Sequence, residues 1–246
     1  MADNRTGCGV ARTLVRSLFM RFTLLIALLL TLPIAAEEPV FEPDPSWGRG
    51  YYARIETTRG RIVAQLLPEQ APQSVAHFVS MARGDLEWLD VVSGETRKGP
   101  YYDGIPIHNV RAGLLFEAGD WTGTGKGAPP IYVPDEGHGP VNFTQSGRLG
   151  MARPGARPSA VQFFVTYASM PELNRVFPCF GKVVEGLDIV LAISESKSYS
   201  NGKPIEPPLI ETIDIFIVGN PLPLEEPRQE AKGPAKLQLH EHLRRD

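Results

Sequence analysis

The residues of this sequence that could form a chemical site together lie between Val161 and Tyr167, where Gln162 stands beside two phenylalanines. This run of β-branched and aromatic residues predicts a buried or half-buried strand. It follows a loop, 153–159, that contains two prolines and a glycine. An amide next to aromatic rings at the mouth of a loop suits a small apolar pocket with one or two hydrogen-bonding groups. The alternative is ordinary core packing.

Two segments before this run have clear hydrophobic periods. Residues 51–68 alternate on both sides of Arg59-Gly60, which predicts a β-hairpin with a short turn. The next stretch changes to helical spacing, with an apolar stripe that includes Val75, Phe78 and Val79, and Gly84 ends it. The segment 85–100 has no clean period, and we expect an excursion with a short helix around 87–92.

The remainder consists of many short strands and a second helix. We expect two strands in 101–118 with a tight Arg-Ala-Gly turn, and ordered irregular structure from Trp121 to Pro140. Further strands are expected at 147–153, 161–167, 178–184 and 209–218, with a short helix at 185–195. This pattern favours an all-β barrel capped by helices over a βαβ fold.

The N-terminus has the layout of a secretory signal. Arginines precede an apolar run, 22–34, and Ala35-Ala36 follow it. We predict a signal peptide over residues 1–36, with Met20 as an alternative start, and a linker at 37–50. The protein would then be periplasmic or secreted, or anchored to a membrane if the leader is retained.

Composition excludes some classes of partner. The 246 residues carry a formal charge of -3 and are 42% hydrophobic, so one globular domain can form a core and no basic surface for nucleic acid is indicated. Cys179 would be the only cysteine left after removal of the leader, which excludes an internal disulfide. The C-terminal segment 219–246, rich in Pro, Glu, Lys and Arg, is expected to be a flexible tail, or alternatively a partner-docking segment.

Six ordered pieces of the chain resemble the cyclophilins, the family of peptidyl-prolyl cis-trans isomerases. They are TTRGRIVAQLLPEQAPQSVAHFV, YYDGIPIHNV, EAGDWTGTG, GRLGMAR, VQFFVTY and FGKVVEGLDIV, and together they span residues 51–218. The resemblance implies an eight-stranded antiparallel closed barrel capped by two α-helices. Because of its predicted leader, the chain resembles the exported bacterial members of the family. This resemblance implies that it acts on proline-containing peptides or unfolded exported proteins.

The resemblance also implies a substrate site. Gln162 matches the glutamine that hydrogen-bonds substrate backbone, Phe164 matches the floor of the proline pocket, and Phe163 would face the core. Leu114 and Leu115 match one wall of the pocket, and Glu117 stands at the position of a second family glutamine. Ala152 matches the small residue beside the peptide, Leu173 matches an apolar residue at the lip, and Phe177 stands at an aromatic position.

One departure concerns the catalytic cation. The family has an arginine after the histidine of a Phe-His-Arg strand, whereas this chain reads Ile107-His108-Asn109. Asn109 is therefore a catalytic position without the charge. Arg111, two residues on and expected on the same strand face, or Arg153, in the loop beside the pocket, could replace it; the alternative for each is a solvated surface arginine.

Two functions follow from these residues. The first is a prolyl isomerase that assists the folding of exported proteins, weakened by the loss of the arginine. The second is a non-catalytic module that binds proline peptides or acts as a chaperone. No histidine lies at metal-ligand spacing, so we predict neither a metal nor an organic cofactor.

Overall fold

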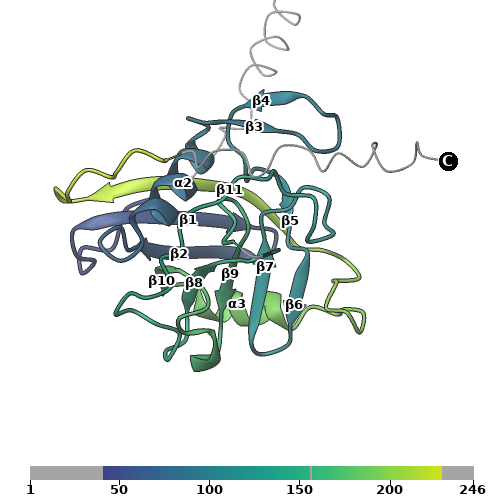
Figure 1. Cartoon of the computed structure of the whole chain (residues 1–246). Helices are drawn as coiled ribbons and strands as arrows, with labels where there is room; N and C mark the ends of the chain where they lie inside the picture. The colour runs from purple at the N-terminus through teal and green to yellow at the C-terminus, as the bar shows by residue number, and fades with distance from the viewer. Residues whose placement is uncertain (1–40, 156, 229–246) are drawn as a thin grey trace, which may run out of the picture. The chain divides into compact units, whose positions relative to one another are not determined.

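The computed structural model describes residues 41–155 and 157–228, and the predicted leader lies outside them. The chain divides into two units, Met1–Pro43 and Asp44–Asp246. Only residues 41–43 of the first unit are described. The second unit contains every helix and strand discussed below (Figure 1).

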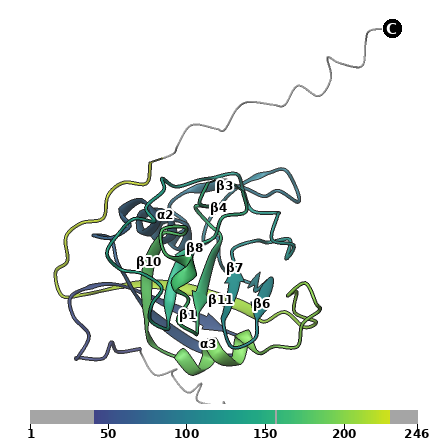
Figure 2. The ribbon, with the colours of Figure 1, turned by 60° about the horizontal axis from the view of Figure 1, so that its bottom comes forward.

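An antiparallel sheet dominates the second unit. Within the described residues it has nine strands in the order β5-β11-β1-β2-β10-β8-β9-β7-β6, and it curls around the core (Figures 1 and 2). The strands are β1 Gly50–Thr57, β2 Gly60–Leu66, β5 Ile105–Pro106, β6 Asn109–Arg111, β7 Leu115–Ala118, β8 Arg148–Met151, β9 Phe163–Thr166, β10 Cys179–Glu185 and β11 Leu209–Val218.

The expected closed barrel of eight strands is not confirmed. The two edges of the sheet are β5 and β6, which follow one another in the chain with only Ile107 and His108 between them. The Ile107 N–H donates to Pro208 O beside β11, and the His108 N–H donates to Glu117 O in β7. The chain thus crosses from one edge to the other at the residues that precede Asn109. Pro106, which lacks an N–H, suits an edge position.

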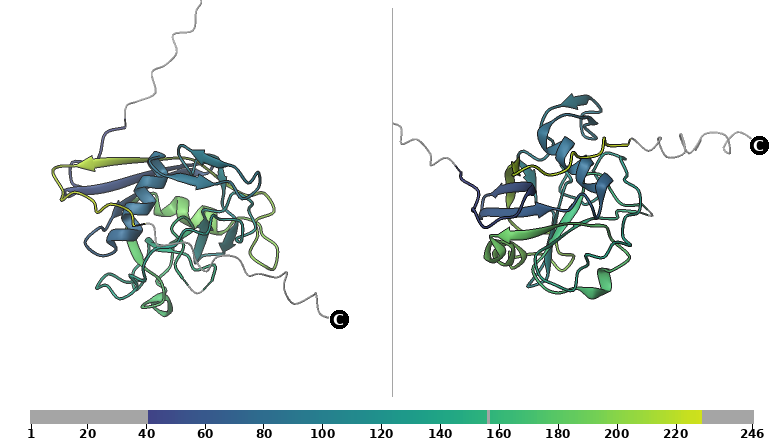
Figure 3. Two further views of the ribbon diagram at one scale, coloured as in Figure 1. Left: turned by 45° about the horizontal axis from the view of Figure 1, so that its top comes forward. Right: turned by 90° about the vertical axis from the view of Figure 1, so that its left-hand side faces the viewer.

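Two α-helices within residues 41–155 and 157–228 cover the sheet, as predicted. Helix α2, Pro72–Arg83, packs against β10 and β11, and helix α3, Leu187–Ser194, packs against β2, β6 and β7 (Figure 3). Gly84 ends α2 in the left-handed conformation with φ 75°, and its N–H donates to Met81 O and Ser80 O. A Cβ at Gly84 would lie 2.4 Å from the Gly99 carbonyl carbon, so glycine is required here on two counts.

An aromatic group at the centre of the core joins α2 to the sheet. The Phe78 ring lies 5.2 Å from Tyr102, 5.4 Å from Phe163 and 5.1 Å from Phe180, between ring centroids. All four side chains are fully buried. Tilted and edge-to-face pairs of this kind add about 0.5–1.5 kcal/mol each to the area they bury. The expectation that Phe163 faces the core is confirmed.

The excursion at 85–100 differs from its prediction. It forms a two-stranded hairpin, β3 Glu87–Leu89 and β4 Thr96–Lys98, rather than a short helix around 87–92. Asp90 fixes the turn by accepting from the N–H groups of Val92 and Ser93. The Trp88 ring packs edge-on against Tyr101 and stacks on Trp121. Trp88 is thus buried by side chains from distant parts of the sequence.

The described part of the predicted tail makes defined contacts. Residues 219–228 follow β11 and run over β1 and α2, where Tyr51 Oη donates to Leu222 O at 3.1 Å and Arg228 N donates to Gln73 Oε1 at 2.7 Å. This part differs from a free appendage. The rest of the predicted tail lies outside the described residues.

Candidate active site

A second apolar cluster, separate from the main core, lies on the outer face of the sheet. Phe164 is its centre, and the Phe143 and Phe177 rings lie 5.4 Å and 5.3 Å from it. The cluster contains four other residues predicted from the sequence or its resemblance and four that were not predicted for the site. The predicted members are Leu115, Ala152, Leu173 and Phe177; the others, apart from Phe143, are Val141, Met170 and Cys179.

Glycine makes room for the Phe164 ring. Gly150 in β8 is directly opposite Phe164 in β9, and a Cβ at Gly150 would lie 2.2 Å from the tip of that ring. The same Cβ would be 2.8 Å from the tip of the Phe143 ring. The missing side chain leaves room for both rings against β8, at the position that the resemblance assigns to the floor of the proline pocket.

The polar part of the site shares a row of the sheet with that floor. Asn109 in β6 is paired with Glu117 in β7, which is paired with Phe164 in β9. Directly opposed residues of antiparallel strands point to the same face, with Cβ atoms about 4.5–5.5 Å apart. Asn109, Glu117 and Phe164 therefore lie side by side, and a small cavity opens beside the first two.

That cavity is bounded by glycine-rich loops. Its lining includes His108, Asn109, Glu117, Gly125, Asn201 and Lys203. Gln162 is buried next to it, and its Nε2 donates to Gly125 O at 3.1 Å. On the other side, Gly202 approaches Asn109 so closely that a Cβ there would lie 2.1 Å from Asn109 Oδ1.

Asp120 holds the loop that supplies the Gly125 carbonyl. Its two carboxylate oxygens accept from the N–H groups of Thr122, Thr124 and Gly127. Burial raises the pKa of Asp120, but the hydrogen bonds from Gly127 and Thr122 outweigh it, so the pKa lies below its usual range. A carboxylate that stays ionised keeps this loop, and with it Gln162, in place.

His108 lies between the two carboxylates of this region. Its Nε2 is 3.8 Å from Glu117 Oε2, and its side chain is almost fully buried. Burial lowers the pKa of His108, whereas the charges of Glu117 and Asp120 raise it by less. His108 is therefore neutral near pH 7, which leaves Glu117 as a carboxylate beside Asn109 without a charged histidine.

The two arginines expected to replace the missing cation are placed differently. Arg153 forms an ion pair with Asp135 at the far side of the pocket. Arg111 is exposed, lies two residues after Asn109 in β6 and is paired with Leu115 of the apolar cluster. Side chains two apart share a face, so Arg111 lies on the face that carries Asn109, Glu117 and Phe164.

One predicted wall residue, Leu114, lies outside the cluster. Leu114 lies in the turn between β6 and β7 and is 40% exposed. The unpredicted members Phe143 and Met170 are joined to each other, since Met170 N donates to Phe143 O, and Asn174 Oδ1 holds the Phe143 N–H. Both residues come from irregular segments without a period, so no sequence pattern pointed to them.

The Cys179 thiol is part of the same cluster. It is buried, and burial raises its pKa to about 11. It is therefore a packing residue and not a nucleophile. Within residues 41–155 and 157–228, no group of three or more His, Cys, Asp or Glu side chains could hold a metal ion.

No helix in the described part of the chain is both long enough and apolar enough to span a bilayer.

Comparisons with known proteins agree with this architecture. The family described as cyclophilin type peptidyl-prolyl cis-trans isomerase/CLD matches residues 52–215. A crystal structure of a Cryptosporidium parvum cyclophilin type peptidyl-prolyl cis-trans isomerase, in the presence of the dipeptide Ala-Pro, superposes with a TM-score of 0.55. It is 30% identical, and the match covers 69% of this chain and 99% of that one.

Two bacterial relatives are more similar in sequence. The peptidyl-prolyl cis-trans isomerase A of Mycobacterium tuberculosis is 37% identical over 165 residues, which cover 66% of this chain and 91% of that protein. The peptidyl-prolyl cis-trans isomerase B of Streptomyces anulatus is 35% identical over 66% of this chain and 94% of its own length. The chain therefore belongs to the cyclophilin-type family and is a peptidyl-prolyl cis-trans isomerase.

Proposed function

We propose that the pocket over Phe164 binds the proline ring of an X-Pro peptide and that the chain isomerises this bond slowly. The single observation that carries the proposal is the row Asn109–Glu117–Phe164, which combines an intact aromatic floor with a neutral residue at the cation position. The Ala-Pro dipeptide in the similar Cryptosporidium parvum structure supports the class of ligand.

The physical basis lies in amide resonance. Rotation about the peptide bond is opposed by a barrier of about 18–20 kcal/mol, because the planar form is stabilised by charge separation. An apolar pocket disfavours that charge-separated form, and a cationic donor aimed at the prolyl nitrogen stabilises the twisted form, in which the nitrogen lone pair is restored. Such groups lower the barrier because they act on the transition state more than on the ground state.

Asn109 performs this task poorly. Its amide can donate a hydrogen bond, but charge-assisted bonds are roughly twice as strong as neutral ones. Glu117 adds a carboxylate next to it. We expect a rate about 10- to 100-fold below that of an arginine at position 109, a smaller loss than the roughly 100- to 1000-fold found when a transition-state donor is removed outright, because the asparagine amide can still donate.

Arg111 is the residue that we propose supplies the remaining positive charge. Its strand position puts its Cα roughly 7 Å from that of Asn109, at about 3.4 Å per residue, which an arginine side chain can span. Arg153 is less suited because Asp135 already holds its guanidinium group.

We further propose that the substrates are unfolded exported proteins. The charge layout of the first 36 residues supports export, and slow X-Pro isomerisation can limit folding in any compartment. Expression of the full chain with a C-terminal reporter, followed by fractionation and N-terminal sequencing, tests this part. A mature N-terminus at Glu37 in the periplasm or medium supports it, and an intact leader in the cytoplasm contradicts it.

The experiment on the site is exchange NMR with a short peptide that contains one X-Pro bond. Wild type is compared with Asn109→Arg, Arg111→Gln and Arg59→Gln, the last a control in the β1–β2 turn, outside the site. We expect Asn109→Arg to accelerate exchange at least 10-fold, Arg111→Gln to slow it about 10-fold, and Arg59→Gln to match wild type.

Each contrary result has a definite meaning. If wild type binds the peptide without accelerating exchange and Asn109→Arg gains activity, the natural chain is a non-catalytic proline-peptide binder, the second function that the loss of the arginine favours. If Arg111→Gln equals wild type, Arg111 is not the cation.

A further inference from the structure

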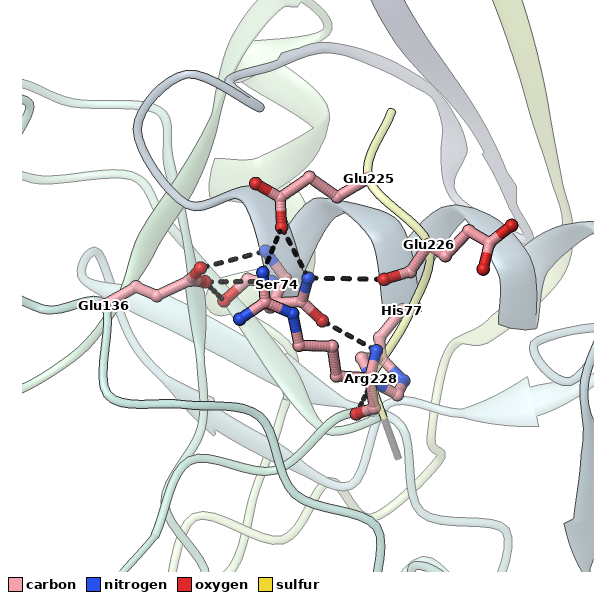
Figure 4. Close-up of polar contacts among 7 residues, drawn as sticks. Ser74, His77, Glu136, Glu225, Glu226 and Arg228 are labelled. Carbon is pink, nitrogen blue, oxygen red and sulfur yellow. Dashed lines mark hydrogen bonds and ion pairs between the residues drawn. The ribbon is translucent and has the colours of Figure 1, made fainter. Parts of the chain in front are cut away.

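Two polar side chains of α2, neither of them part of the candidate active site, are buried. Gln73 is 2% exposed and His77 is fully buried. The polar partners of both side chains come from residues about 150 positions later. Figure 4 shows His77 beside Arg228, with Glu225 and Glu226 on the same segment. Buried amide and imidazole groups require such partners, since an unpaired one costs about 1–3 kcal/mol.

The Gln73 amide contacts the main chain of that later segment with both of its ends. Nε2 donates to Glu226 O at 3.3 Å, and Oε1 accepts from the Arg228 N–H at 2.7 Å. In an extended chain the carbonyl before a residue and the N–H after it point to the same side, as in a β-ladder. Pro227, the residue between them, has no N–H that could be left unpaired.

His77 adds a third main-chain contact. Its Nε2 is 2.9 Å from Arg228 O, and because a carbonyl only accepts, Nε2 carries the hydrogen. Tyr51 Oη donates to Leu222 O at the other end of the segment. These hydrogen bonds go to main-chain atoms of the bound segment and not to its side chains. Any extended segment of suitable shape can therefore form them.

Side-chain contacts add some selectivity. Leu224 packs against the main core, and Glu225 Oε2 accepts from Gln73 Nε2 at 2.8 Å. Before Leu224 the fit is looser: a cavity of about 720 Å³ lies between Pro221–Pro223 and the ends of β1 and β2. The groove, which we define by Tyr51, Gln73 and His77, therefore contacts the residues from Leu224 to Arg228 closely. It leaves space beside Pro221 and Pro223.

We propose that Tyr51, Gln73 and His77 form a second peptide-binding site, which takes an extended proline-containing segment with a leucine followed by an acidic residue. In this chain the site holds its own residues, Leu222 to Arg228. It is distinct from the isomerase pocket and reads the main chain through side-chain amide and imidazole groups.

Ser74 is a matched neighbour with a different role. Its N–H and hydroxyl group both donate to Glu136 Oε2, while Gln73 N donates to Glu136 Oε1, so Glu136 caps a helix whose N-cap residue, Ala71, has no capping side chain. Figure 4 shows Glu136 reaching the start of α2 from a different segment than Glu225. A change at Ser74 thus disturbs the helix start without touching the bound segment.

The first experiment adds the segment back as a separate peptide. Arg228→Pro in the full chain removes the N–H group that donates to Gln73 Oε1. This change weakens binding of the chain's own segment, and the side chains of the groove are unchanged. A synthetic peptide of residues 220–228 is titrated into ¹⁵N-labelled wild type, Arg228→Pro and Arg228→Pro/Gln73→Ala, with the Tyr51, Gln73 and His77 amide signals followed by NMR.

We expect the peptide to bind Arg228→Pro at least 10-fold more tightly than wild type, in which the linked segment competes at an effective concentration near the millimolar range. The double variant should lose this binding. Equal shifts in the single and double variants, or none with several millimolar peptide, would overturn the proposal.

Limited trypsin digestion tests the same site in chains that keep the natural segment. Trypsin cleaves after Arg228, whose carbonyl is held by His77. We expect cleavage there to be about 10- to 100-fold faster in Gln73→Ala than in wild type, and unchanged in Ser74→Ala. Equal cleavage in all three would show that the groove does not hold the segment.

Discussion

The apolar and polar halves of the candidate site lie in the same row of the sheet but are held in place in different ways. Phe164 is held by rings on two sides and by the absence of a side chain at Gly150, contacts that come from three separate segments. In the proposed mechanism, in contrast, the positive charge near the reacting bond comes from a single side chain, Arg111, because Asn109 is neutral. Packing is redundant and charge is not, so one substitution changes the chemistry while the pocket survives.

The largest expected effect separates the two neighbouring phenylalanines. Phe164→Leu removes the pocket floor, and we expect kcat/KM to fall about 30-fold, roughly 2 kcal/mol of transition-state binding. Phe163→Leu, its matched control in the main core, should lower the free energy of unfolding by about 1–3 kcal/mol and leave kcat/KM of the folded protein unchanged. Exchange NMR and urea unfolding measure the two quantities.

The comparison breaks if the two variants behave alike. Equal losses of activity would mean that the outer cluster is ordinary packing and that the peptide binds elsewhere.

Gly150→Ala is expected to have the next largest effect. The added methyl group would overlap the tip of the Phe164 ring at 2.2 Å, so the ring must turn away. We expect about a 10-fold rise in KM with little change in kcat, and about 1–3 kcal/mol less stability. Gly94→Ala is a control for the introduction of a methyl group, because nothing lies within 4 Å of a Cβ there, although its φ of 76° adds backbone strain. A KM equal to that of wild type would show that the floor tolerates a tilted ring.

Glu117→Gln sharpens the polar half of the comparison. It removes a negative charge next to Asn109 while keeping the size of the side chain. Two unit charges about 8 Å apart interact with an energy of about 2 kcal/mol at an effective dielectric constant of 20. The prolyl nitrogen carries only a partial charge, so its interaction energy with Glu117 is smaller. We expect kcat/KM to rise about threefold. A fall in kcat/KM would instead mean that Glu117 positions a hydrogen-bond donor. If that donor is Arg111, the double variant Arg111→Gln/Glu117→Gln should have the same kcat/KM as Arg111→Gln alone.

The smallest effect concerns the pH dependence of stability at His108. Burial lowers the pKa of this group, and in the described residues its Nδ1 has no hydrogen-bond partner to stabilise a proton. The unfolded chain, with a pKa near 6.5, therefore binds the proton more readily, so stability falls as the pH drops below about 6.5. His77 acts with the same sign, since burial also lowers its pKa.

His108→Gln should reduce this slope. Each buried neutral histidine contributes up to about 1.4 kcal/mol per pH unit between its folded and unfolded pKa values. Urea unfolding of wild type and His108→Gln at pH 7, 6 and 5 measures the difference. Parallel stability curves for the two proteins would mean that His108 titrates normally in the fold.

The sequence predicts the elements with regular periods, and its resemblance to the family predicts part of the candidate site. The hairpin of β1 and β2, helix α2 and strand β11 follow from alternation or helical spacing, and Gln162, Phe164 and Ala152 follow from the family pattern. Regular patterns work because each element buries one face against the same core.

The features that the sequence does not predict depend on long-range partners. Trp88 is buried only because Tyr101 and Trp121 meet it, and β3 is too short to show a period. Glu136 caps α2 from a loop about 60 residues away, and Phe143 joins the pocket through Met170. No local pattern marks such pairs, because the side chains become neighbours only in the folded chain.

The pairing of β1 with β11 also has a consequence for biosynthesis. β1 can form its hairpin with β2 as soon as both have left the ribosome, but its other edge pairs with residues up to Val218. For most of translation this edge presents unpaired N–H and C=O groups, and a domain rich in such distant contacts folds slowly. The nascent chain is therefore open to intermolecular strand pairing until β11 has left the ribosome.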